Sequence, residues 1–580
     1  MASRRDRRRA DLTGASFRWG LLAIWLFAVA VRFWGLARFN SLVFDEVYYV
    51  KFANNYLTQT PFFDGHPPLA KYLIAIGIWL GQKMPGDFPH NHLAGSWLST
   101  WSYRWLNALT GSLIPLLSAG VVYQLTHQRR MALLAAFLVA MDGLFLVESR
   151  YALVNVYLVL FGLGGQYGFL AAINLAAMNS DRRWPTVLWL LLAGVSFAAS
   201  FAIKWNGLGF LLGAYLIWCL AWGVRWCNPG ADRDPNGHPD SFATPKAYRR
   251  AQPIPRPPAA AHRKLPVESG IEPHTRRLTL QSPSHLPSLW TLVCLTIVPL
   301  LVYALIWLPH LHLNPTMGFW RLQQEILSYH QRVGGNTPQV HPYCSPWYSW
   351  PLLLRPMVYF FEAVPQATDQ LPVYGPPLPA GTAQVVYDVH AIGNPWLWWF
   401  STAAIGLLTV YLLGHLWQWL TTAVALLPIA SRRLWRIGRN GASQRAFPSP
   451  PLAPAIPDFP PTPPNARGER ASVSFNWLAA YFVLNYAANW LPWAKVTRCT
   501  FVYHHMGAAI FGFFGLAFVL DRWLQMKPIC PGQPRQPYLR LVAIGILLGI
   551  VLGFLFWLPL YLGLPLSPMG RYLRLWLPGW

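Results

Sequence analysis

The sequence predicts an all-α, polytopic integral membrane protein, and composition, apolar runs and charge placement together support that prediction. Of the 580 residues, 54% are hydrophobic and 15% are aromatic, including 31 Trp, which is typical of a membrane protein. Apolar runs long enough to cross a bilayer, which takes roughly 20 helical residues, recur along most of the chain. Only 21 Asp and Glu stand against 46 Lys and Arg, so each acidic cluster needs an explanation.

About eleven membrane-spanning helices are expected from the length of these runs. The first run follows a basic arm, lacks a small-residue cleavage site and contains Arg32, so we interpret it as a retained span and not as a signal peptide. The predicted spans are roughly 20–38, 104–125, 131–148, 150–178, 186–203, 206–224, 288–309, 396–428, 475–491, 503–520 and 540–562.

The formal charge of +25 is explained by topology. With the N-terminus cytoplasmic, about thirty of the 46 basic residues lie in or beside the predicted inner segments, as the positive-inside bias requires. Nucleic acid is therefore not an expected partner. The inner segments are 1–19, 126–130, 179–185, 225–287, 429–474 and 521–539.

The expected organisation alternates membrane modules with polar segments. Two inner segments are rich in Pro, Arg, Ser and Ala and are too polar to bury a core, so we expect flexible linkers there, with spacers favoured over ligands for a partner domain. The predicted units are a basic arm 1–19, an N-terminal membrane module 20–224 with an outer loop 39–103, a linker 225–287, membrane helices 288–428 with an outer loop 310–395, a proline-rich linker 429–474, and C-terminal helices 475–580.

Six cysteines contain no Cys-x-x-Cys pair, so neither a zinc site nor a disulfide framework is indicated. Cys344 and Cys499 both fall on the predicted outer side and could in principle pair, but the sequence gives no reason to expect that they do.

Ionisable residues gather on the predicted outer side. An acidic pair after a span, such as Asp45 and Glu46, is by itself most simply a solvated turn. Ionisable groups at membrane depth, however, cost about 2.5 kcal/mol or more each unless they are paired or face a wet cavity. Snorkelling or local pairing would explain some of them singly, but we expect several to form one polar site. The residues are Arg32, Asp45, Glu46, Asp64, His66, Lys71, Arg104, Glu148, Arg150, Lys204, Arg498 and His504.

Several short motifs carry a resemblance to a known family. They are VRFWGL, FDEVYYVKFANNYL, FFDGHPPLAK, RWLNALTG, ESRYALVNVYL, FAIKWNGL, EILSYH followed by HPYCSPWYSWPL, and TRCTFVYHH. In this order they resemble the protein O-mannosyltransferases, membrane glycosyltransferases with the GT-C fold. The spaced FDE and FFDGHPP motifs are specific, whereas Lys-Trp-Asn-Gly alone is weak.

The resemblance implies a GT-C membrane fold with Asp45 and Glu46 as the catalytic pair in the first outer loop. It further implies a polyprenyl phosphate mannose donor and Ser or Thr acceptors on secreted or membrane proteins, and it leaves a dimer open. The eukaryotic members carry a folded sugar-binding domain in an outer loop. The loop 310–395 is too short to hold one, so acceptor selection stays open.

The residue types are also consistent with this chemistry when the family resemblance is left aside. A hydroxyl that attacks an anomeric carbon needs a base, and no general acid is required when the leaving group is a phosphate. We expect Asp45 to be the base and Glu46 to orient the loop or a neighbouring Arg. Cations would stabilise the leaving phosphate, so no metal or other cofactor is expected. The candidate cations are Arg150, Lys204 and Arg498, with Arg104 and His504 behind them, and Arg32, Asp64 and His66 complete the predicted substrate site.

Other functions remain open at this stage. One is another lipid-phosphosugar transferase, such as an aminoarabinose transferase acting on lipid A; an oligosaccharyltransferase is disfavoured because no Trp-Trp-Asp-Tyr-Gly motif occurs. Others are a transporter, for which repeats and broken helices are expected, and a non-catalytic partner subunit. Without the extra domain or an endoplasmic-reticulum retrieval signal, we expect a bacterial plasma membrane, with the active site on the outer side.

Overall fold

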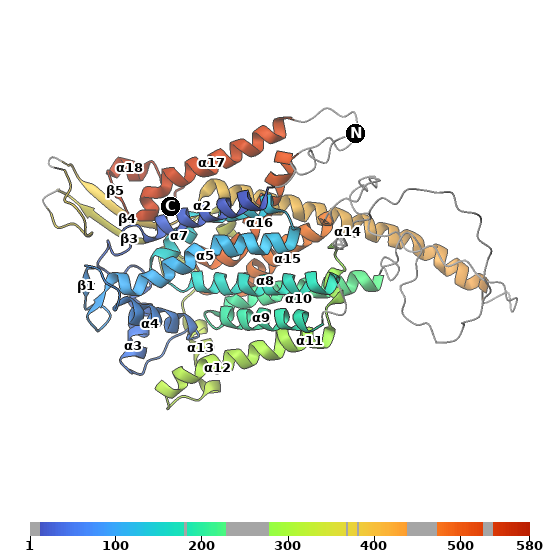
Figure 1. Cartoon of the computed structure of the whole chain (residues 1–580), viewed down its shortest axis with the longest axis horizontal. Coiled ribbons are helices and arrows are strands. Elements are labelled where there is room, and N and C mark those ends of the chain that lie inside the picture. The colour runs from blue at the N-terminus through green and yellow to red at the C-terminus, as the bar shows by residue number, and fades with distance from the viewer. Residues whose placement is uncertain are drawn as a thin grey trace, which may run out of the picture.

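Long helices lying side by side form the body of the molecule (Figure 1). The computed structural model describes residues 12–178, 183–227, 278–366, 369–379, 382–437, 473–525 and 537–580. One end of the bundle carries the short helices α3 (Glu46–Leu57), α4 (Leu69–Gly81) and α18 (Pro568–Tyr572) together with the strands, and we call it the site end (Figure 1). Most of the predicted basic arm and of both linkers lies outside the described residues.

Nine helical spans in the described part of the chain are long and apolar enough to cross a membrane, or ten if one bent pair counts as a single span. The fold is therefore a polytopic helical membrane fold, although eleven spans are not confirmed. The difference lies at α15 (Phe475–Trp490), which has only 16 residues before a 3-10 turn continues the chain. The spanning helices are α2 (Gly14–Phe33), α5 (Thr100–Thr126), α8 (Asn155–Met178), α9 (Arg183–Phe201), α10 (Leu208–Cys227), α11 and α12 (Ser288–Leu292, Val298–Leu313), α14 (Pro395–Ile437), α16 (Met506–Gln525) and α17 (Pro537–Leu562).

The bent pair replaces the straight span expected over 131–148. Helices α6 (Arg129–Ala140) and α7 (Gly143–Arg150) meet at an angle of 62°. Asp142 starts α7 by accepting a hydrogen bond from the backbone N–H of Phe145 at 2.9 Å, and it also accepts one from the indole N–H of Trp398 in α14 at 2.7 Å. A side chain at position 143 would collide with the ring of Tyr561, so glycine allows the close packing at this bend.

Two small antiparallel sheets were not expected from the sequence. β1 (His90–Asn91) pairs with β2 (Leu98–Ser99) within the predicted loop 39–103. β3 (Met357–Val364) pairs with β4 (Val385–Ala391), and β4 pairs with β5 (Pro565–Leu566) in the order β3-β4-β5. The second sheet therefore joins the segment 310–395 to the chain that follows α17.

The remaining helical elements of that segment lie close to the bundle. α13 (Phe319–Arg332) is amphipathic, with Leu322 and Ile326 buried and Trp320 exposed. Elsewhere in the described chain, short 3-10 turns occur at Trp205–Gly207, Ser282–His285, Trp347–Leu352, Leu491–Lys495 and Val502–His505, and a π-helical stretch, Val293–Ile297, joins α11 to α12.

Candidate active site at one end of the bundle

Asp45 occupies the residue before the first turn of α3, in a strained stretch of backbone. The preceding residue, Phe44, has a φ of 53°, which a non-glycine residue adopts at a cost of about 1 kcal/mol or more. The ring of Phe44 stacks on Tyr359 of β3 with centroids 4.3 Å apart, which holds the backbone in this conformation. Strand β3 therefore helps to set the direction of Asp45.

Glu46 is fully buried and has direct partners on every side. Its carboxylate forms an ion pair with Arg104, with distances of 2.9 Å from Nε and 2.6 Å from the second terminal nitrogen. It also accepts hydrogen bonds from the backbone N–H groups of Val43 and Ala152, both at 2.8 Å. Glu46 thus ties the start of α3 to α5 and to the residues after α7.

Three predicted substrate-binding cations do not line the cavity described below. The terminal N–H groups of Arg104 also donate hydrogen bonds to the backbone carbonyls of Leu36, Phe39 and Ser41. Arg150 donates to the carbonyls of Val31, Arg32 and Trp34 at the end of α2, where a cation also suits the helix dipole. Arg32 donates from Nε to the hydroxyl of Ser149 at 2.9 Å.

For these three arginines, binding of the donor phosphate stays a prediction, and the structure shows that their side chains have other partners. Each is at most 2% exposed. Arg104 and Arg150 bond the chain between α2 and α3, whereas Arg32 connects α2 to Ser149 in α7. Sequence reasoning could find the buried charges but not their partners, because the carbonyls that receive their hydrogen bonds are more than 60 residues away in several cases. Glu148 and Arg150, which could have paired with each other, instead have separate partners.

Lys204, by contrast, does line the cavity. It lies just before the span that begins at Trp205 and is 4% exposed. Its Nζ is 3.3 Å from Oδ1 of Asn155 and 5.0 Å from the centre of the Tyr503 ring. Asn155 in turn donates to Glu148 at 3.0 Å, and the hydroxyl of Tyr359 donates to the other oxygen of Glu148.

This chain of contacts, Tyr359–Glu148–Asn155–Lys204, connects strand β3 to the cation beside Asp45. Sequence reasoning named Lys204 and Glu148 but missed Tyr359 and Asn155. Asn155 stands in the quoted ESRYALVNVYL motif, seven residues after Glu148, which was the available signal for its role.

Asp45 and Lys204 shift each other's protonation. Burial raises the pKa of the Asp45 carboxyl to about 6, with Lys204 opposing this rise and Asp64 adding to it. Burial lowers the pKa of Lys204 to about 8, against the opposing effect of Asp45 and Glu148. Within the part of the chain that is described, the Asp45 carboxylate accepts no hydrogen bond, so its lone pairs are available to a substrate.

The FFDGHPP motif is anchored by Lys71 in the first turn of α4. The ammonium group of Lys71 lies 2.6 Å from a carboxylate oxygen of Asp64 and donates to the carbonyl of His66 at 2.9 Å. The His66 ring lies 5.2 Å from the ring of His330 in α13. Lys71 was noted in the sequence but not assigned to the site, and His330 was also missed.

A cavity of about 1120 Å³ adjoins these residues. Its polar wall contains Lys204, Arg498, His66, His330 and His504, so a cationic wall faces the space. Burial is the main cause that lowers the pKa of His66 and His330, the latter to about 4, which keeps both imidazoles neutral. Asp45 itself does not line the cavity but lies next to Lys204, which does.

Apolar lining of the cavity comes from a membrane-spanning helix. Leu208, Leu211, Leu212 and Tyr215 of α10 line the cavity, and Leu208 and Leu212 are 46% and 40% exposed. A cavity that joins cations to an open apolar helix face suits a ligand with an anionic head and a hydrocarbon tail. Among the described residues, no group of three or more His, Cys, Asp or Glu side chains could hold a metal ion.

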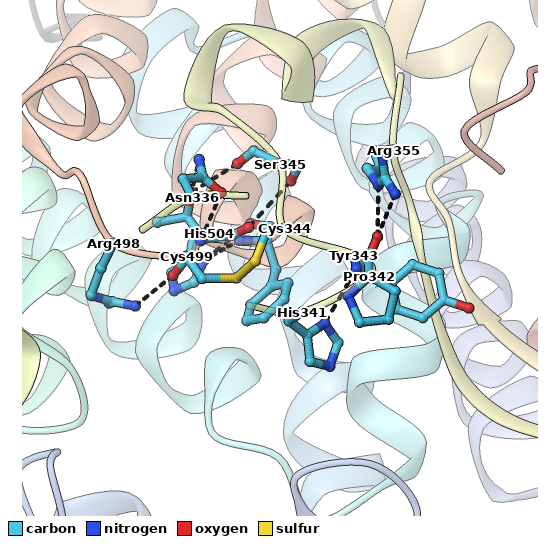
Figure 2. The surroundings of a disulfide bond; sticks show 12 residues. Asn336, His341, Pro342, Tyr343, Cys344, Ser345, Arg355, Arg498, Cys499 and His504 are labelled. Carbon is cyan, nitrogen blue, oxygen red and sulfur yellow. Dashed lines mark hydrogen bonds between the residues drawn. A yellow bond between two sulfur atoms is a disulfide. The ribbon is translucent and has the colours of Figure 1, made fainter. Parts of the chain in front are cut away.

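The cysteine prediction needs a correction as well. Cys344 and Cys499 form a disulfide across 155 residues of sequence, beside Arg498 (Figure 2). Spacing in the chain gave no signal for this pair, because only the folded arrangement of the two segments brings the cysteines together.

Comparison with known proteins identifies the family. The family model described as dolichyl-phosphate-mannose-protein mannosyltransferase matches residues 22–232. A second model, the C-terminal four TMM region of protein-O-mannosyltransferase, matches residues 315–442 and 458–580, so the two together cover most of the chain. The chain belongs to the protein O-mannosyltransferase family.

Relatives in this family are similar over a limited region. Protein O-mannosyl-transferase 1 of Danio rerio is 33% identical over 192 residues, which is 32% of this chain and 26% of that protein. Dolichyl-phosphate-mannose--protein mannosyltransferase 1 of Saccharomyces cerevisiae is 32% identical over 200 residues, which is 34% of this chain and 24% of that protein. The matched region thus spans about a quarter of the length of these curated relatives.

The whole fold is similar to a solved structure of the family. The Pmt1-Pmt2 complex of S. cerevisiae, bound to the sugar donor, superposes with a TM-score of 0.63 at 14% identity. The alignment covers 98% of this chain and 93% of that one, which supports the GT-C fold over its full extent.

Proposed function

We propose that this chain transfers mannose from a polyprenyl phosphate mannose to Ser or Thr hydroxyls of secreted or membrane proteins, with inversion at the sugar. The observation that carries the proposal is the Asp45 carboxylate, which accepts no hydrogen bond from the described residues and lies beside Lys204, a residue that lines the cavity. Family membership supplies the reaction class, and the named relatives are mannosyltransferases.

In the proposed reaction, the acceptor hydroxyl attacks the anomeric carbon while its proton moves to Asp45. The bond between that carbon and the phosphate oxygen breaks, and the polyprenyl phosphate leaves with the bonding electron pair. Lys204 and Arg498 stabilise the charge that develops on the phosphate in a water-poor site. His66 and His504 line the same space, and their ring N–H groups can donate hydrogen bonds to the sugar or phosphate.

The cavity supports a lipid donor. Its cationic wall would take the phosphate, and the exposed leucines of α10 would take the first units of the polyprenyl chain from the surrounding bilayer. Glu46, Arg104 and Arg150 would keep the loop before α3 in position and would not touch the donor. Arg32 would connect α2 to α7.

We also propose that the reaction faces the outer side of a bacterial plasma membrane. The disulfide Cys344–Cys499 supports this orientation, because such bonds persist in oxidising compartments outside the cytoplasm. An assembly of two such chains is a further part of the proposal, since the similar solved structure is a complex of two proteins.

The test is the mass added to a Ser/Thr-rich peptide after incubation with purified protein and polyprenyl phosphate mannose. One hexose per modified hydroxyl is the expected result. No added mass, or the addition of another sugar from its own lipid phosphate in a parallel assay, would overturn the proposed substrate.

The cations should also make a divalent metal unnecessary, as the proposed roles of Lys204 and Arg498 require. Transfer after exhaustive chelation should match untreated protein within about two-fold, less than the loss expected when a phosphate-binding charge is removed. Activity that disappears with chelator and returns with Mg²⁺ or Mn²⁺ would contradict these roles.

A further inference from the structure

Backbone hydrogen bonds and a disulfide join two segments that both line the cavity. Gly335 forms an antiparallel bridge with Arg498. The backbone N–H of Asn336 donates to the carbonyl of Thr497 at 3.1 Å, and that of Cys499 donates to the carbonyl of Gly334 at 3.0 Å. Further along, the N–H of Ser345 donates to Thr500 at 2.8 Å, next to the disulfide (Figure 2).

The disulfide closes this ladder where the chain would otherwise be held by hydrogen bonds alone. Cys344 and Cys499 are each 4% exposed, with Cα atoms 5.2 Å apart. Two residues before Cys344, the carbonyl of Pro342 accepts a hydrogen bond from Nε of Arg355 at 2.9 Å (Figure 2). One strip, 334–345, is thus held between the chain leading to β3 and the strip 497–500.

Arg498 sits within the ladder, directly before the bonded Cys499. Its guanidinium donates to the carbonyl of Cys499 at 3.0 Å (Figure 2). Arg498 also lines the cavity, as Lys204 does. The residues from Gln331 to Gly335 line the same cavity from the strip on the other side of the ladder. The position of Arg498 relative to the cavity therefore depends on how the two strips are held together.

We propose that the Cys344–Cys499 disulfide is a positioning device for donor capture: it fixes Arg498 at the cavity so that its guanidinium can hold the donor phosphate. This inference rests on the proposed function and adds a residue pair that acts through Arg498 and does not touch the reacting atoms. Lys204, which is held separately through Asn155 and Glu148, keeps its place when the disulfide is absent.

The test compares donor KM and kcat in the full-length protein. Cys344→Ser and Cys499→Ser should each raise the KM for polyprenyl phosphate mannose about 10-fold, the value of one charge-assisted hydrogen bond to an anion, while kcat at saturating donor changes less than about two-fold. Cys227→Ser, which removes an exposed free cysteine, is the matched control and should leave both constants unchanged.

A double-mutant cycle separates positioning from general stabilisation. Arg498→Gln alone should raise the donor KM, and adding Cys499→Ser to that variant should raise it no further, because both changes remove the same contact. If the two effects multiply, or if the cysteine variants lower the midpoint of thermal unfolding without changing the donor KM, the disulfide is only a structural brace and the proposal is wrong.

Because loss of a disulfide can prevent folding, the wild-type protein is also reduced after purification and assayed at once. Reduction should raise the donor KM, and reoxidation should restore it; an unchanged KM in fully reduced, folded protein overturns the proposal. Failure of the proposed function looks different, since the oxidised wild-type protein would then transfer no mannose at all.

Discussion

At the residue scale, Asp45 and Glu46 are neighbours, yet only Glu46 has its charge met by a direct ion pair among the described residues. Glu46 is enclosed by Arg104 and two backbone N–H groups, whereas Asp45 interacts with Lys204 through space. Because the surroundings of the two carboxylates differ, substitution of Asp45 should affect activity, whereas substitution of Glu46 should affect stability.

Asp45 should control the acid side of the pH profile. The pKa of Asp45 is raised to about 6 and that of Lys204 is lowered to about 8, and transfer needs the first ionised and the second protonated. The rate should therefore rise with pH through about 6 and fall through about 8. Steady-state transfer to peptide between pH 4.5 and 9.5 measures both limbs.

Asp45→Asn should lower turnover by about 100-fold or more and remove the acid limb, because the amide cannot accept the proton. Donor binding should change little. If residual activity keeps the same acid limb, the base lies elsewhere, with Asp64 next in line.

Glu46→Gln should lower the stability of the folded protein. It leaves the fully buried Arg104 without a counter-charge, which costs about 3 to 5 kcal/mol when one partner of a buried pair is removed. The matched control is Glu325→Gln, whose ion pair with Arg332 is exposed and is worth at most about 1 kcal/mol. Thermal unfolding of both variants in the same detergent provides the comparison, and equal midpoints would contradict the structural role of Glu46.

At the element scale, strand β3 links the outlying sheet to the site. Its Tyr359 stacks on Phe44 and donates to Glu148, so one side chain touches both the residue before Asp45 and the chain of contacts that leads to Lys204. The free energy of one hydrogen bond is modest, but this one helps to orient two proposed catalytic groups.

Tyr359→Phe should therefore lower kcat/KM about 3- to 10-fold, because it keeps the ring stack and removes only the hydroxyl. Tyr374→Phe is the control, since Tyr374 lies between β3 and β4 and is 61% exposed. Transfer rates and thermal midpoints of both variants are compared, and a loss of midpoint without a loss of kcat/KM would place the role of Tyr359 in stability alone.

Some features of the fold and of the candidate site could be predicted from the sequence, and others could not. Asp45, Lys204 and Arg498 could be found because a charge at a helix end near a membrane is costly and therefore visible in the chain. The roles of Arg104 and Arg150 could not, because a cation looks the same in sequence whether it receives a phosphate or a backbone carbonyl. Hairpin β3–β4, the bend at Asp142 and the Cys344–Cys499 bond all depend on contacts with distant segments.

At the scale of the whole molecule, the bundle has two unlike ends. The site end carries α3, α4, the sheets and the disulfide, while α14 extends past the other helices at the opposite end (Figure 1). Between the ends, helix surfaces are apolar, and Leu300, Leu301 and Leu305 of α12 are each at least 59% exposed, as lipid-facing residues are.

These two ends give the proposed orientation a direct test. A cysteine at the exposed Gln366, in the β3–β4 hairpin, should react with a membrane-impermeant maleimide added to intact cells, because the disulfide argues for an oxidising outer compartment at this end. Cysteines at Ala260 and Pro460, which lie outside the described residues in the predicted basic inner linkers, should react only after the membrane is opened. The free cysteines are first replaced by Ser, so that each signal reports one position. Labelling at 260 or 460 in sealed cells, or protection of 366, would reverse the orientation and would place the Asp45 site on the cytoplasmic side.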